Sequence, residues 1–166
     1  MRRNTYPPMQ KHIASTQKMA FTSEEDIFNK LVSKNNAFRK IKQLVNFTKL
    51  VEPLRELYSD LGKTGFDVEQ GFKALVVQWF EDYSDREMEN AVRENIAIRW
   101  FCGFALTEDT PDHTYFCKLR KRIGAKRVAD MFNAVTETLK GYGLIGNIFT
   151  FIDASAIVTK THLWEE

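Results

Sequence analysis

Residues 66–83, FDVEQGFKALVVQWFEDY, decide the fold class of this 166-residue chain. Apolar side chains recur there at intervals of three and four residues, which is the period of one face of an α-helix. These side chains are Val68, Phe72, Leu75, Val76, Trp79, Phe80 and Tyr83. Asp67 is placed to be the N-cap of this helix, and Ser84 with Glu87 has the spacing of a capping box for the next one. An apolar face this wide is buried against other helices, so we predict a mostly α fold.

The helical period continues on both sides of this segment. Further helices are predicted over residues 23–32, 36–45, 46–62, 113–123 and 125–143. Ser23 is placed to cap the first of them, and Pro53 marks a kink or a restart. Pro111 and Asp112 open the helix that Gly124 ends.

The residues after Gly146 follow a different pattern. The stretch IFTFIDASAIV (148–158) is aromatic and β-branched, which favours a strand. We therefore expect a basic, flexible arm over residues 1–22, a helical domain over 23–145 and the first strand of another domain over 146–166.

The composition is that of an ordinary globular protein, with 43% apolar and 28% charged residues. Thirteen phenylalanines predict an aromatic core. No apolar run approaches the roughly 20 residues that span a bilayer, and no apolar segment follows the arginines of MRRNTYPPMQKH, so we expect neither a membrane span nor a secretory signal. Two cysteines, Cys102 and Cys117, fit a reducing cytoplasm, where we expect the protein to be located.

The charges are unevenly distributed, although the net charge is only +2. Residues 1–22 contain basic side chains and no acid. The stretch KLRKRIGAKR (118–127) holds six cations, which are Lys118, Arg120, Lys121, Arg122, Lys126 and Arg127. Charges separated in this way indicate one basic face on a nearly neutral body.

The predicted helix over 113–123 is amphipathic. On a helical wheel Tyr115, Phe116, Leu119 and Ile123 share one side, whereas Thr114, Lys118, Lys121 and Arg122 lie opposite, with Cys117 and Arg120 nearby. Such a helix fits the second helix of a helix-turn-helix element in a DNA major groove. His113, Thr114 and Cys117 would then approach base edges, while the lysines and arginines neutralise phosphates. A solvated helix with a lysine-rich outer face fits the same spacing, so both interpretations stay open.

Four segments, in this order, resemble the N-terminal part of insertion-sequence DDE transposases of the IS-five type. They are YSDREMEN (83–90), IRWFCGF (98–104), PDHTYFCKLRKRI (111–123) and IDASAIV (152–158). The resemblance covers most of the chain, from about residue 19 to its end. It implies that the helical region binds double-stranded DNA at the terminal inverted repeats of a transposon, in a cytoplasmic, nucleoid-associated protein.

The same resemblance implies a ribonuclease-H-like catalytic domain after the helices. Two aspartates and a glutamate of that domain hold two Mg²⁺ or Mn²⁺ ions, and Asp153 would be the first of these catalytic metal ligands. Glu165 and Glu166 are the only acids after Asp153. We therefore expect this chain alone to be catalytically incomplete and to bind no such ion tightly. Without the resemblance, Asp153 would be read as a helix N-cap.

Three other interpretations bear on partners and metals. The chain could act as a DNA-binding repressor of transposition, or as a dimerisation module that forms a homodimer and does not bind DNA. A downstream transposase half is a further expected partner. Zinc is not expected, because Cys102, His113 and Cys117 have no fourth ligand close in the sequence.

Overall fold

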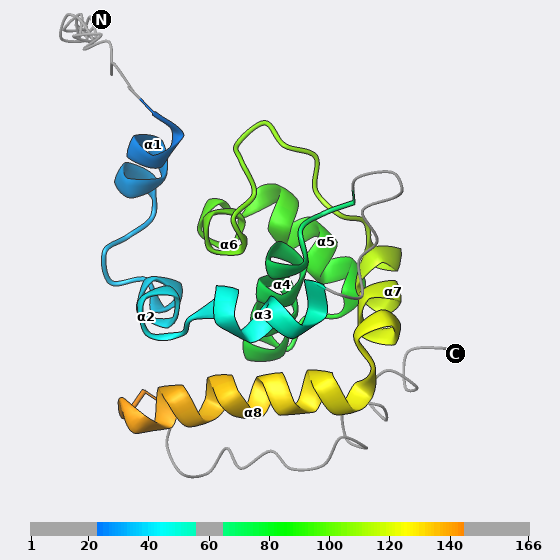
Figure 1. The fold of residues 1–166 in the computed structure, drawn as a ribbon. Helices are drawn as coiled ribbons and strands as arrows, with labels where there is room; N and C mark the ends of the chain where they lie inside the picture. The colour runs from blue at the N-terminus through cyan, green and yellow to red at the C-terminus, as the bar shows by residue number, and fades with distance from the viewer. Residues whose placement is uncertain (1–22, 56–64, 145–166) are drawn as a thin grey trace, which may run out of the picture.

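The computed structural model describes residues 23–55 and 65–144, which contain eight helices and no strand (Figure 1). The helices are α1 (Glu24–Leu31), α2 (Ala37–Leu44), α3 (Phe47–Arg55), α4 (Val68–Glu81), α5 (Asp85–Glu94), α6 (Ile96–Cys102), α7 (His113–Ile123) and α8 (Ala125–Gly141). The prediction of a mostly helical fold is confirmed for these residues. The arm predicted over 1–22 and the strand predicted after Gly146 lie outside the described residues.

Side-chain caps set the starts of the helices. The Ser23 hydroxyl accepts the backbone N–H of the residue three positions on at 3.2 Å. Asp67 and Ser84 each form a complete capping box, at the starts of α4 and α5. The Asp112 carboxylate accepts the backbone N–H of Tyr115 at 3.1 Å and so begins α7. Each of these helix starts was predicted from the sequence, because a cap depends only on residues close in the chain.

Helix α4 lies at the centre of the fold. It contacts α3, α5, α6 and α7 (Figure 1). All residues from Gly71 to Val77 are buried, so the middle of the helix is covered on every side. Trp79, Phe80 and Tyr83, which extend the predicted apolar stripe, are only half-buried. The segment that decides the fold class is therefore the helix on which α3, α5, α6 and α7 pack.

Aromatic rings join five helices into one core. The Phe72 ring of α4 lies 6.2 Å from the ring of Phe47 and 5.7 Å from that of Phe132, measured between centroids. The Phe101 ring of α6 lies 5.6 Å from Phe47 and 5.0 Å from Phe38. Such tilted and edge-to-face pairs stabilise a core by roughly 0.5–1.5 kcal/mol each beyond the area they bury. The aromatic core predicted from the phenylalanine content is confirmed.

One glycine makes the corner between α7 and α8. Gly124 has φ +86°, a backbone conformation that side chains with a Cβ rarely adopt. Figure 1 shows α7 at the N-terminal end of α8 and running in a different direction from it. The last turn of α7 and the first turn of α8 therefore lie next to each other.

Candidate nucleic-acid interface

The inner face of α7 is fixed on the core by apolar contacts. Phe116, Leu119 and Ile123 are buried, and α7 contacts both α4 and α5. Tyr115 is half-buried, and its ring packs edge-on against Phe66 with 5.3 Å between centroids. The apolar side of the predicted helical wheel is therefore the side that packs.

A glycine allows α7 to lie directly on the backbone of α4. A Cβ atom added at Gly71 would lie 2.7 Å from Leu119 Cδ2 and would also meet the Tyr115 hydroxyl. Distances this short require the two helices to separate or the side chains to move. Gly71 therefore sets how closely α7 approaches the core.

A polar network ties the last turn of α7 to α4 and α5. The Arg120 guanidinium donates to both carboxylate oxygens of Asp85, at 2.7 and 2.9 Å, and to the Gln78 side-chain oxygen at 3.2 Å. The Gln78 amide in turn donates to Asp85 at 2.6 Å. The side chains of Arg120 and Asp85 are only 18% and 25% exposed. The fork-shaped guanidinium and the carboxylate match in geometry, so this network fixes the rotation of α7 about its axis.

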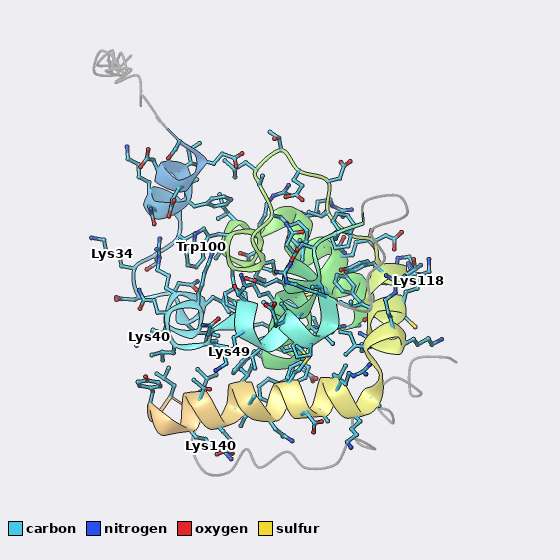
Figure 2. The ribbon with its side chains drawn as sticks, viewed as in Figure 1. Lys34, Lys40, Lys49, Trp100, Lys118 and Lys140 are labelled. Carbon is cyan, nitrogen blue, oxygen red and sulfur yellow. The ribbon has the colours of Figure 1, made fainter. Side chains whose placement is uncertain are left out.

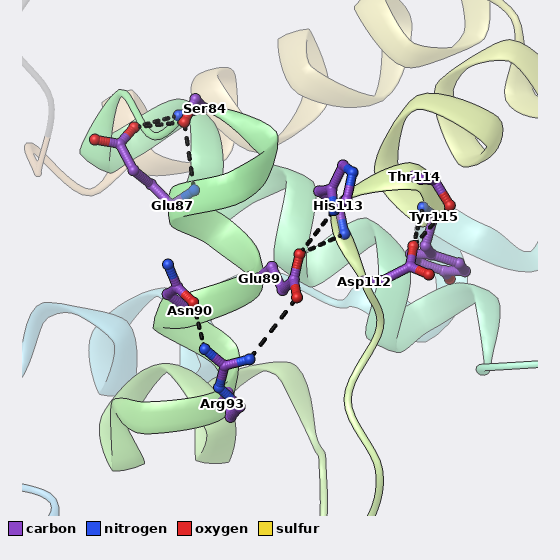
Figure 3. A network of polar contacts seen from close by, with 9 residues as sticks. All are labelled: Ser84, Glu87, Glu89, Asn90, Arg93, Asp112, His113, Thr114 and Tyr115. Atoms are coloured by element: carbon purple, nitrogen blue, oxygen red, sulfur yellow. Dashed lines mark hydrogen bonds and ion pairs between the residues drawn. The ribbon is translucent and has the colours of Figure 1, made fainter.

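A second network holds the N-terminal end of α7, and Figure 3 shows it at close range. One carboxylate oxygen of Glu89, on α5, accepts the backbone N–H of His113 at 3.0 Å and lies 2.9 Å from the His113 ring Nδ1. These hydrogen bonds, the ring contact first, lower the pKa of Glu89. The Thr114 hydroxyl donates to Asp112 at 2.7 Å and is the main cause of the lowered pKa of that carboxyl group.

These two carboxylates determine which part of α7 suits an anion. The positive end of a helix dipole lies at its N-terminus and favours a phosphate there. In this structure Glu89 and Asp112 already occupy that position as ionised groups. A phosphate would therefore meet repulsion at the start of α7 and attraction towards its end.

The exposed cations gather at the C-terminal half of α7 and across the Gly124 corner. We name this set the α7–α8 basic surface; it consists of Lys118, Lys121, Arg122, Lys126 and Arg127, all of them exposed. Among the described residues, Lys118, Lys121, Lys126 and Arg127 make no ion pair. Cys117, half-exposed and free, lies on the same helix. The structure therefore places five of the nine predicted DNA-binding residues on the C-terminal half of α7 and the first turn of α8.

The other predicted DNA-binding residues have different surroundings. Arg120, placed near the outer face by the helical wheel, turns towards α5 and binds Asp85. His113 and Thr114 belong to the network at the start of α7. Asp85 precedes Arg120 by 35 positions, so no local pattern in the sequence could reveal the pair.

A comparison with family models identifies the family of this chain. A family model described as a transposase domain, DUF772, matches residues 26–122, more than half of the chain. The chain belongs to this transposase domain family. Comparisons with curated proteins and with solved structures give no match.

The matched segment contains most of the residues that the structure describes, and we call it the DUF772 domain. It runs from α1 to the last turn of α7, so it contains the Arg120 network, while Lys126 and Arg127 of α8 lie beyond it. Within residues 23–55 and 65–144, no three His, Cys, Asp or Glu side chains are grouped so that they could hold a metal ion. Asp153 lies outside the described residues, so its role as a Mg²⁺ or Mn²⁺ ligand stays a prediction. In the same ranges no helix has the length and apolar character to cross a membrane.

Sequence reasoning missed a second group of basic residues in the DUF772 domain. Lys34, Lys40 and Lys49 are exposed and, within the described part of the chain, make no ion pair. A signal for them was present in the sequence, because residues 27–51 contain six cations and no acid.

Proposed function

We propose that this domain is the DNA-binding N-terminal region of an IS-five-type transposase, and that its α7–α8 basic surface binds duplex DNA at the terminal inverted repeats. The observation that carries this proposal is the grouping of exposed cations on the outer side of α7, which is fixed to the core, and on the first turn of α8; within the described residues Lys118, Lys121 and Lys126 make no ion pair. Membership of a transposase domain family supports the same conclusion.

The way α7 is held favours binding to a charged duplex. Its inner face is buried, and Arg120 ties it to Asp85, so little backbone order remains to be gained on binding. The exposed lysines are flexible point charges suited to phosphate oxygens rather than to a planar, two-pronged contact. Most of the affinity would therefore come from the phosphate backbone and would depend strongly on salt.

Recognition of a particular DNA sequence requires contacts to base edges as well. On α7 the exposed Thr114 and the half-exposed Cys117 are the small polar side chains nearest to the lysines. We assign them to base contacts, and His113 to holding the start of the helix through Glu89.

Fluorescence anisotropy tests the proposal. The dissociation constant of the full chain for a labelled terminal-repeat duplex would be measured between low and moderate salt. The test variant is Lys118→Gln/Lys121→Gln/Lys126→Gln, and its control is the same triple substitution to Arg, which keeps the charge. Loss of three phosphate contacts should make the slope of log K against log salt less steep by about 2.7. The arginine control should keep the slope of the unmodified chain.

The result also separates this function from its rival. If the glutamine variant keeps both the affinity and the salt slope of the unmodified chain, the basic surface is merely solvated. The domain would then be better explained as a dimerisation module.

A further inference from the structure

Three exposed lysines form a second basic surface away from α7. Lys34 lies between α1 and α2, Lys40 lies on α2 and Lys49 lies on α3. Figure 2 shows them on the α2 side of the domain, whereas Lys118 lies on the opposite side. We name these three residues the α2–α3 basic surface.

The stretch of sequence that carries these three lysines contains no acidic residue that could balance their charge. Between Asp26 and Glu52 the chain has six cations and no acid. On a helix, an acid three or four positions from a lysine can pair with it, and α2 has no acid. Glu52, the next acid along the chain, makes no ion pair with Lys49 within the described residues. Acids of its own segment therefore do not compensate the charge of this surface.

Two further cations of this segment serve the fold and leave the three lysines to solvent. The Arg39 guanidinium lies 4.7 Å from the centroid of the Trp100 ring and donates to the carbonyl oxygens of Val32 and Ser33, at 3.0 and 3.2 Å. Lys42 Nζ lies 4.2 Å from the centroid of the same ring and donates to the Trp100 carbonyl at 3.3 Å. These contacts anchor α2 on α6, so the segment that carries the exposed lysines has a fixed position.

The chemistry of the surface selects the kind of anion. Its exposed groups are ammonium ions from three separate segments, which suit a row of phosphates rather than one enclosed ion. Trp100 is half-buried beneath Arg39 and Lys42, so its ring is not open for stacking on an unpaired base. The backbone of a duplex fits these features better than a single strand does.

We propose that the α2–α3 basic surface binds a second segment of duplex DNA, so that one domain holds two DNA segments on opposite sides. This inference rests on the proposed function of the α7–α8 basic surface. A domain of about 100 residues has a radius of gyration of about 13 Å, so opposite faces are roughly 30 Å apart. A straight duplex lying on one face does not reach the other. The domain would therefore bridge two duplexes.

A bridging assay tests this inference with the full chain. One duplex is attached to beads, protein is added, and capture of a second, fluorescent duplex is measured at about 0.1 M salt. The test variant is Lys34→Gln/Lys40→Gln/Lys49→Gln. Its matched control is Lys118→Gln/Lys121→Gln/Lys126→Gln, which removes the same number and type of charges from the other surface.

The inference predicts that the test variant loses bridging but not single-duplex binding. Loss of three phosphate contacts makes the slope of log K against log salt less steep by about 2.7. If the α2–α3 basic surface of the variant and that of the unmodified chain bind DNA equally at 1 M salt, the variant surface binds about 500-fold more weakly at 0.1 M salt. Capture of the second duplex should therefore fall to background, while the anisotropy Kd for one duplex changes by about twofold or less. In the unmodified chain, lysine acetylation with mass spectrometry should show Lys34, Lys40 and Lys49 protected only when bridging occurs. That measurement needs no variant to fold.

Two results would overturn the inference and leave the proposed function standing. The first is an unmodified chain that binds one duplex tightly and captures no second one. The second is bridging that survives in the test variant, because the duplexes would then be joined by dimerisation or by another part of the chain. A variant with all six substitutions isolates the proposed function: if its single-duplex affinity and salt slope equal those of Lys34→Gln/Lys40→Gln/Lys49→Gln, it is the proposed function that fails.

Discussion

Replacing Arg120 with alanine should destabilise the domain more than it weakens DNA binding. The substitution removes two charge-assisted hydrogen bonds to Asp85 and leaves that carboxylate, 25% exposed, with Gln78 as its side-chain partner. It also removes the contact between Arg120 and the Gln78 oxygen. The opposite expectation follows if Arg120 binds phosphate, because an exposed cation can be removed with little change in stability.

The size of the effect follows from the burial of the pair. Exposed ion pairs contribute about 0–1 kcal/mol, and breaking a buried pair costs about 3–5 kcal/mol. Arg120 and Asp85 lie between these limits, with side chains 18% and 25% exposed. We therefore expect a loss of about 2.5 kcal/mol in the free energy of unfolding, equal to a fall in Tm of about 8 °C at roughly 3 °C per kcal/mol for a chain of this size.

A double-mutant cycle measures this pair. Urea unfolding followed by circular dichroism would be compared for the unmodified chain, Arg120→Ala, Asp85→Ala and the double variant. The coupling energy between the two positions should be about 1.5 kcal/mol or more. Arg120→Lys, which keeps the charge but not the fork geometry, should restore only part of the stability.

The reasoning fails if Arg120→Ala unfolds at the urea concentration of the unmodified chain. It also fails if Arg120→Ala makes the salt slope of DNA binding less steep by about 0.9, the value for one lost phosphate contact, with Tm unchanged. Either result would return Arg120 to the DNA-binding face that the helical wheel gave it.

Three further predictions concern packing, thiol reactivity and pH. Gly71→Ala should lower the free energy of unfolding by about 1–3 kcal/mol in urea melts, because its Cβ would overlap Tyr115; a neutral result would mean that α7 lies farther from α4. Burial raises the pKa of the Cys102 thiol to about 12, so a thiol reagent should modify Cys117 in the folded chain and Cys102 only after unfolding; equal rates would contradict this. The lowered pKa of Glu89 means that its stabilising effect is present above the ordinary carboxyl pKa and is lost as pH falls through the lowered value. Glu89→Gln should therefore show a weaker dependence of Tm on pH below about pH 5, whereas identical pH curves would refute the contact.

The helices were largely predictable because their signals are local. The apolar period of α4 and the capping residues Ser23, Asp67 and Ser84 depend on neighbours within four positions, and the structure confirms them. The alternation within α7 likewise separated a buried face from an exposed one. The apolar period did not predict where burial ends along α4, because Trp79 belongs to the predicted stripe and is only half-buried.

The amino-acid sequence by itself determined where the helices begin, which faces are apolar and that basic residues cluster over 118–127. Only the tertiary structure decided which of those cations face solvent. Arg120 and Lys121 are adjacent in the chain, but one is paired with Asp85 and the other is exposed. The physical reason is that an ion pair depends on the distance between two charges in space, and the packing of α5 against α7 sets that distance. The grouping of Lys34, Lys40 and Lys49 on one side arises in the same way, from the folding of three segments onto a common core.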